Sequence, residues 1–127
     1  MLKTKKPANQ ENGSSKAKKP DLNKRHTSFV AREGFSRKLL TAVKIGSKTE
    51  VKKLIVLGAD PNVRNYRDET PLILAVKNGD TGIAEFLADN GADVNYSTSD
   101  GRSALYIARK NRDIPMQRLL IRKGAKW

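Results

Sequence analysis

The chain has 127 residues, no cysteine and a formal net charge of +13. This length suits one domain, and the absence of cysteine excludes disulfides and cysteine-ligated metal sites and fits a reducing intracellular setting. No stretch approaches the roughly 20 apolar residues of a membrane-spanning helix, and the charge suits acidic proteins, nucleic acid or anionic surfaces without choosing among them.

Residues 1–26 are rich in Lys, Pro, Asn, Ser and Gly and contain almost no large apolar side chain. Such a segment cannot bury enough surface to offset the entropy of ordering, so we expect a disordered basic tail. It lacks the apolar run of a secretory signal. Its clusters Lys5-Lys6 and Lys16-Ala17-Lys18-Lys19 fit a two-part nuclear import signal or phosphate contacts. They also fit a solubilising spacer, the commoner role of short lysine clusters.

A short transition follows the tail. Phe29, Val30 and Phe35 could cover the first helices, either as a single helical turn or as a docked extended segment. The single histidine, His26, lies at the edge of the tail without a second histidine or a cysteine to share a metal. We therefore assign residues 1–34 to the tail and its transition, and residues 35–127 to one folded domain.

The first of three pairs of short helical patterns lies within residues 35–66. Its apolar residues recur at helical spacing, and Gly46 marks the turn between the two helices. The predicted inner faces are Leu39, Leu40, Ala42 and Val43 in the first helix, and Val51, Leu54, Ile55 and Leu57 in the second.

The second pair, within residues 67–99, has the clearest boundaries. Thr70 is suited to cap the first helix, and Pro71 is tolerated at the first helical position. Gly79 divides the pair, Asp80 can cap the second helix, and Gly91 stands where a helix ends in a left-handed residue. The apolar faces are Leu72, Ala75 and Val76, then Ile83, Ala84, Phe86 and Leu87.

The third pair, within residues 100–127, departs from this pattern. Arg112 stands in the position of the turn glycine, so either it adopts a positive φ, at a cost of about 1–2 kcal/mol, or the turn changes. The neighbouring Asn111 tolerates such angles better and could absorb the strain. The single tryptophan, Trp127, is expected to fold over the last helices or to remain free as a contact residue.

Residue types repeat every 33 positions along this region, as at Gly58, Gly91 and Gly124. Helices this short are not stable alone, so the repetition predicts a stacked array in which each pair covers its neighbours. The same period holds for Leu39, Leu72 and Leu105, for Ala42, Ala75 and Ala108, and for Leu54, Leu87 and Leu120.

The second pair resembles the ankyrin repeat. The family's TPLHxAA appears as Thr70-Pro71-Leu72-Ile73-Leu74-Ala75-Val76, and its GADVN as Gly91-Ala92-Asp93-Val94-Asn95. The resemblance covers about residues 35–127 in three repeats, 35–66, 67–99 and 100–127. It implies an all-α helical repeat solenoid with projecting β-turn fingers. Ile73 replaces the family's histidine, and we expect its burial to compensate by roughly 1.5–3 kcal/mol.

The resemblance also implies a protein-interaction module, with a concave face of fingers and inner helices. We expect a monomer that binds a protein partner with about micromolar affinity. Tyrosine and arginine, present in the first finger, are enriched at binding hot spots. The family's pattern places partner-binding residues at the finger tips, Tyr66, Arg67, Glu69, Ser99, Asp100 and Arg102, and at the inner-helix ends, Lys77, Asn78, Lys110 and Asn111.

Charge alternates along the array, with net charges of +5 over residues 34–66, −4 over 67–99 and +6 over 100–127. The central acids either attract the neighbouring repeats or bind a partner. The second functional hypothesis is a nucleic-acid-associated or nuclear regulatory protein that acts through the basic tail and the cationic end repeats. We expect a cytoplasmic protein, or a nuclear one if the tail is an import signal.

No pattern in the sequence indicates catalysis, a cofactor or a metal. Glycine-rich phosphate loops are absent, and a catalytic triad would need His26 in the tail. Asp68 and Glu69 lie in a finger turn, where we expect exposed carboxylates without raised pKa values. The aspartates of the GAD motifs, Asp60 and Asp93, are explained by hydrogen bonds to turn backbone. We therefore predict a non-enzymatic protein.

Overall fold

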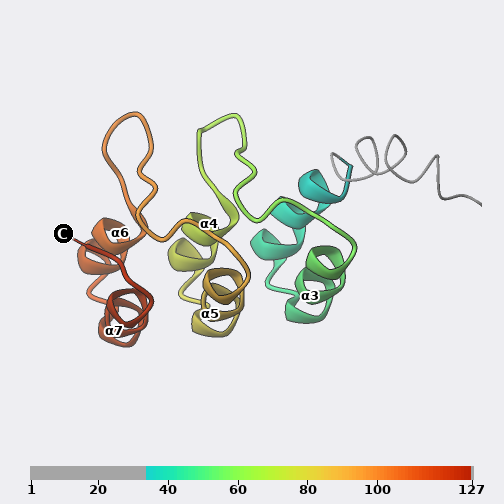
Figure 1. The fold of residues 1–127 in the computed structure, drawn as a ribbon. Helices are drawn as coiled ribbons and strands as arrows, with labels where there is room; N and C mark the ends of the chain where they lie inside the picture. The colour runs from blue at the N-terminus through green and yellow to red at the C-terminus, as the bar shows by residue number, and fades with distance from the viewer. Residues whose placement is uncertain (1–33, 127) are drawn as a thin grey trace, which may run out of the picture. The chain divides into compact units, whose positions relative to one another are not determined.

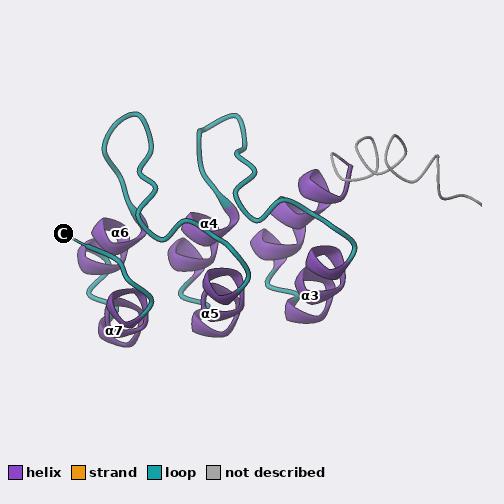
Figure 2. Cartoon of the chain, viewed as in Figure 1, coloured by secondary structure: helices purple, strands orange, loops and turns teal. Residues whose placement is uncertain are grey.

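The computed structural model describes residues 34–126, and all regular secondary structure in this part of the chain is helical (Figures 1 and 2). The predictions for the tail, for Phe29 and Val30, for His26 and for Trp127 lie outside the described residues.

Three helix pairs stand side by side in the described region (Figure 1). The inner helices are residues 34–45, α4 (Pro71–Asn78) and α6 (Ala104–Lys110). The outer helices are α3 (Lys48–Val56), α5 (Thr81–Asp89) and α7 (Ile114–Arg122). Two long loops project from the row of inner helices, between α3 and α4 and between α5 and α6 (Figure 2). This is the predicted all-α solenoid with fingers.

Local capping chemistry sets where α3 to α7 begin. Each follows a Ser, Thr or Asp whose side chain accepts a hydrogen bond from the backbone N–H three residues later, which satisfies a donor that the helix leaves free. The predicted caps are confirmed: Thr70 accepts from the Ile73 amide at 3.3 Å, and Asp80 from the Ile83 amide at 3.0 Å.

The turn inside each helix pair contains one residue with a positive φ. These residues are Gly46 at +90°, Gly79 at +72° and Arg112 at +56°. Arg112 itself therefore adopts the left-handed conformation, and Asn111 keeps a right-handed φ of −82°. The suggestion that Asn111 absorbs the strain is wrong, because the turn keeps the same position in all three pairs.

The core lies between the two rows of helices. Most residues of the predicted apolar faces are buried along it, while Leu40, Ile55 and Phe86 are partly buried and pack against it. Ile73 is only 1% exposed, so the expected burial in place of the family's histidine is confirmed. Leu57 is an exception: it is 46% exposed, and its predicted core role is wrong. The α3 helix ends at Val56, and Leu57 is its C-cap, equivalent in the period to the polar residues Asn90 and Lys123.

Asparagine side chains join successive repeats. Asn62 donates to the carbonyl of Gly91 at 2.9 Å and accepts from the amide of Asp93 at 2.7 Å. Asn95 makes the same two bonds to Gly124 and Lys126. The aspartates of the GAD motifs accept from the amides of these asparagines at 2.9 Å, as predicted from their role in the turn.

Candidate functional site

The first finger is a loop built around the side chain of Asn65. Its amide oxygen accepts hydrogen bonds from the backbone amides of Arg67 at 2.8 Å and Glu69 at 2.9 Å. Its backbone N–H donates to the carbonyl of Glu69 at 2.9 Å, which closes the loop. Asp68 inside the loop has a φ of +66°. The loop therefore holds Tyr66 and Arg67 at a defined tip.

Glu69 is the anchor of this finger and not an exposed tip residue. It is 4% exposed, so the expectation that this carboxylate faces solvent is wrong. Its two oxygens accept from the Asn65 side chain at 3.1 Å and from the ammonium group of Lys77 at 2.7 Å. Burial alone would raise the pKa of Glu69, but the hydrogen bonds from Lys77 and Asn65 outweigh it and lower the pKa.

The second finger uses Thr98 where the first uses Asn65. Thr98 is buried, its hydroxyl bonds the Asp100 carboxylate, and it accepts from the Arg102 amide at 3.1 Å. Asp100 also forms an ion pair with Arg102 at 2.9 Å. The hydrogen bonds from Thr98 and Arg102 lower the pKa of Asp100. Gly101, with a φ of +84°, occupies the position that Asp68 takes in the first finger.

The two fingers contact each other through Asp68. Its carbonyl accepts from the hydroxyl of Tyr96 at 3.0 Å, and its carboxylate accepts from the Ser99 amide at 3.1 Å. Arg64 forms an ion pair with Asp68 at 3.4 Å and lies over the ring of Tyr96, 6.0 Å from its centroid. The fingers therefore present their tips in a fixed relation to one another.

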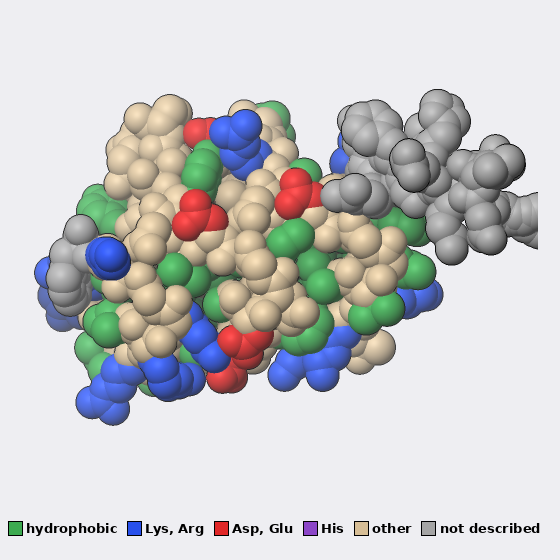
Figure 3. All heavy atoms as spheres, in the orientation of Figure 1, with side chains coloured by type: hydrophobic (Ala, Val, Ile, Leu, Met, Phe, Trp, Pro, Cys, Tyr) green, Lys and Arg blue, Asp and Glu red, His purple; other side chains and the backbone are tan. Residues whose placement is uncertain are grey.

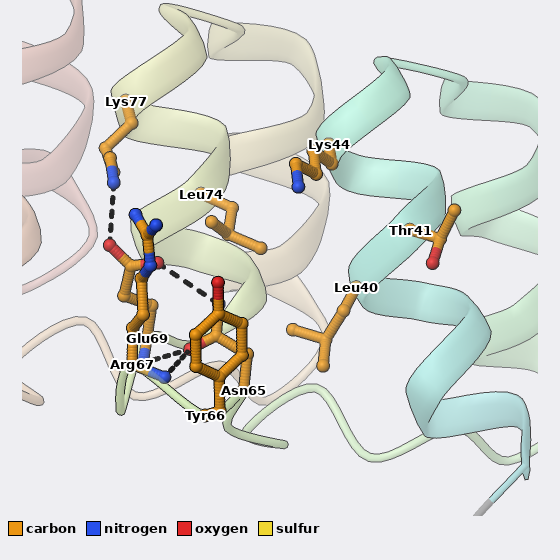
Figure 4. A pocket seen from close by; sticks show the side chains of 9 residues that line it. All are labelled: Leu40, Thr41, Lys44, Asn65, Tyr66, Arg67, Glu69, Leu74 and Lys77. Atoms are coloured by element: carbon orange, nitrogen blue, oxygen red, sulfur yellow. Dashed lines mark hydrogen bonds and ion pairs between the residues drawn. The ribbon is translucent and has the colours of Figure 1, made fainter.

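A pocket of about 250 Å³ lies between the first finger, the 34–45 helix and α4 (Figure 4). Figure 4 shows Leu40 and Leu74 projecting into the space between these two helices, with Tyr66 and Arg67 beside it and Lys44 and Lys77 toward the helix ends. The full lining is Leu40, Thr41, Lys44, Asn65, Tyr66, Arg67, Glu69, Leu74 and Lys77.

The pocket brings together four of the residues that the sequence suggested for partner binding: Tyr66, Arg67, Glu69 and Lys77. Tyr66 is 90% exposed, with the Arg67 guanidinium 5.5 Å from its ring centroid. Ser99, Asp100 and Arg102 belong to the second finger and do not line this pocket, nor do the inner-helix residues Asn78, Lys110 and Asn111.

Asn78 has a structural role in this arrangement. Its side chain donates to the carbonyls of Val43 and Lys44 at 3.1 and 3.2 Å, at the end of the preceding inner helix. Lys110 and Asn111 are exposed at the end of α6.

Sequence reasoning missed Leu40, Thr41, Lys44, Asn65 and Leu74 as lining residues of the pocket. One signal was available, because Lys44 precedes Lys77 by the same 33 residues that separate Lys77 from Lys110. The repeat period therefore places a lysine near the end of every inner helix. Asn65 gave no such signal, since Thr98 replaces it in the next repeat.

The acids of the second repeat are largely used inside the array. Figure 3 shows basic side chains over both ends of the outer row and acidic side chains between them. Glu85 lies 3.5 Å from Arg122 and 3.8 Å from Lys123, and Lys123 lies 2.6 Å from Asp89. At this junction the acids attract the next repeat, which is one of the two roles considered for them.

Within residues 34–126, no group of three or more His, Asp or Glu side chains could hold a metal ion. None of the helices in this same part of the chain combines the length and the apolarity that crossing a membrane requires.

Comparison with known proteins agrees with this geometry. A family model described as ankyrin repeats matches residues 39–127 in three copies, more than half of the chain. The matched range includes both fingers and all three helix pairs except residues 34–38 at the start of the first helix. No curated protein matches the chain.

Proposed function

Because the chain belongs to the ankyrin repeat family, whose repeats are generic protein-interaction modules, we propose that it binds a protein partner on the face formed by its fingers and inner helices. The chain then acts by binding and not by catalysis. The partner-binding residues that we propose are the exposed tip residues Tyr66, Arg67, Ser99 and Asp100, with Lys77, Arg102 and Lys110 beside them.

The observation that carries this proposal is the closure of the first finger by hydrogen bonds around an exposed aromatic tip. Tyr66 is 90% exposed, yet the backbone on either side is closed by the bonds of Asn65 and anchored by Glu69 to α4. A large side chain that is positioned before binding loses little conformational freedom when a partner covers it. Tyrosine and arginine at such a position are typical of hot spots.

Affinity capture from native cell extract tests the proposal. The full chain and the Tyr66→Ala/Arg67→Ala double variant are used as baits, with a Lys52→Ala/Lys53→Ala variant as the matched control on outer helix α3. We expect at least one protein to be captured by the parent and the control and lost with the double variant. Captured sets that are identical for all three baits would contradict binding on this face.

The same experiment separates the nucleic-acid alternative. Binding through phosphates weakens steeply between low and physiological salt and is abolished by nuclease treatment. A protein partner that remains bound after both treatments supports the proposed function. Loss of every captured protein after nuclease treatment would favour the alternative.

A further inference from the structure

The apolar part of the pocket lies between the 34–45 helix and α4. Leu40 is half-buried, and Leu74 is 9% exposed on the neighbouring inner helix. Both project into the space between the helices, and the ring of Tyr66 stands at its edge (Figure 4). A leucine-sized side chain placed there would contact Leu40, Leu74 and Tyr66. Each Å² of apolar surface that it removes from water would stabilise the complex by about 25 cal/mol.

The charges around the pocket are unbalanced. The single carboxylate of the lining, Glu69, is buried and both of its oxygens are engaged with Asn65 and Lys77. Lys44 and Arg67 form no ion pair with any carboxylate of residues 34–126. Lys77 uses one of its three N–H donors on Glu69 and keeps two. The rim of this pocket therefore offers several cationic hydrogen-bond donors and no accessible carboxylate.

The lysines also form a regular row. Lys44, Lys77 and Lys110 occupy one position of the repeat, near the end of each inner helix. Packed helices are about 8–10 Å apart. An extended chain in the polyproline II conformation has three residues per turn and advances about 3.1 Å per residue. Carboxylates three residues apart on such a segment lie on one face about 9 Å apart, which would match the spacing of successive lysines.

We propose that this pocket recognises an extended acidic segment of the protein partner in the polyproline II conformation, with acidic residues three apart and an apolar residue between them. The apolar side chain enters between Leu40 and Leu74, and the flanking carboxylates pair with Lys44 and Lys77. This inference rests on the proposed function and names the chemistry of the partner at the same face.

A synthetic peptide tests the proposal directly. The probe is a short fluorescent peptide of repeating Glu-Leu-Ser, whose glutamates lie three apart. Two matched control peptides replace Glu by Gln and Leu by Ser. Binding to the full chain is measured by fluorescence anisotropy at physiological salt. We expect both control peptides to bind at least roughly tenfold more weakly, a loss of about 1.4 kcal/mol.

Charge-reversal variants then locate the binding site. Lys44→Glu should weaken binding of the Glu-Leu-Ser peptide roughly tenfold and leave binding of the Gln peptide unchanged, as a direct pairing requires. Lys53→Glu on the outer helix α3 makes the same charge change away from the pocket and should have little effect. Residues 1–33 contain nine Lys and Arg, and their attraction for the peptide is the same in both variants. Thermal midpoints of both variants confirm that they remain folded.

Two results would overturn the proposal. One is the absence of binding by the Glu-Leu-Ser peptide. The other is equal weakening by Lys44→Glu and Lys53→Glu, which would show attraction by net charge alone. These outcomes leave the proposed function standing if Tyr66→Ala/Arg67→Ala still loses a protein captured from extract. Failure of that capture experiment, by contrast, would contradict the binding face itself.

Discussion

The hydroxyl of Tyr96 donates a hydrogen bond to the backbone carbonyl of Asp68, 3.0 Å away, although 28 residues separate them in the chain. Asp68 holds a positive φ in the first finger, and its carboxylate also accepts from the amide of Ser99 in the second. The two projecting loops are thus joined beside their tips. A partner that covers both fingers meets one surface and not two independently moving loops.

Removal of this hydroxyl should loosen the second finger without unfolding the domain. In Tyr96→Phe we expect the Ser99 amide to exchange hydrogen faster, because the contact that holds the fingers together is weakened. The thermal midpoint should fall by under about 5 °C, since a single part-buried hydrogen bond is worth about 1 kcal/mol or less. Tyr106→Phe, a change at a half-exposed ring, is the control. Unchanged exchange at Ser99 would show that the fingers are not coupled.

Glu69 should make the stability of the domain depend on acid. Its pKa is lowered in the folded state, so ionised Glu69 contributes stability above the unfolded pKa, and this contribution is lost as the pH falls through the folded pKa. The thermal midpoint of the parent should therefore fall below about pH 4.5, the ordinary pKa of this group. In Glu69→Gln the fall should be smaller. The same acid dependence in both proteins would contradict this role.

Lys77→Met tests the cause of that pKa shift. Burial raises the pKa of Glu69, and the ammonium group of Lys77 is the foremost group that opposes it. With methionine at position 77, only the hydrogen bond from Asn65 remains strong, so the pKa should rise. NMR titration of the Glu69 carboxyl carbon measures it in both proteins. A pKa that stays low in Lys77→Met would assign the shift to Asn65 instead.

Leu87 should be essential to folding, since it is fully buried on the outer helix of the central pair. Leu87→Ala removes that packing at a cost of about 2–5 kcal/mol. Small domains are stable by only about 5–15 kcal/mol, so we expect the variant to be unfolded or nearly so. Circular dichroism during heating measures it. A thermal midpoint lowered by less than about 3 °C would contradict the packing described here.

Arg112→Gly should stabilise the protein. Arg112 adopts a φ of +56° without the freedom of glycine, and Gly46 and Gly79 occupy the same turn position in the other pairs. We expect the free energy of unfolding to rise by about 1 kcal/mol, an increase that is reduced in part by the greater freedom of glycine in the unfolded chain. Urea unfolding measures this gain.

The control replaces a glycine by a residue with a Cβ at the equivalent turn position of the second helix pair. Gly79→Ala places a Cβ on a residue with a φ of +72°, so it should destabilise the domain by about 1–2 kcal/mol. If Arg112→Gly lowers stability, the Arg112 side chain makes contacts worth more than the strain.

The fold could be predicted from the sequence because its determinants are local and periodic. Thr70 and Asp80 cap helices through bonds that span three residues, and the 33-residue repetition shows which apolar faces meet. Glu69 could not be placed in the same way. An acidic residue in a polar turn is normally solvated, and the partner that permits its burial, Lys77, lies eight residues away on α4.

The pocket required the structure for a similar reason. Its lining combines α4 and a finger with Leu40 and Lys44, which belong to the preceding repeat. The sequence assigned Leu40 to the core by its spacing, and nothing local shows that it borders a space open to a partner. The finger residues were easier to select, since the family's repeat pattern assigns the finger tips to particular positions of the sequence.

The asparagine bonds between repeats have a consequence for how such a chain can change in length. Asn62 and Asn95 bond the same two backbone positions of the repeat that follows, so the two junctions are chemically interchangeable. A second copy of residues 67–99 could be inserted after Ser99. The original Asn95 would then bond the backbone of the inserted copy, and the Asn95 of the inserted copy would bond Gly124 and Lys126. Duplication or loss of a whole repeat can therefore lengthen or shorten the row of fingers and inner helices, and with it the proposed binding face, while every junction keeps its asparagine bonds.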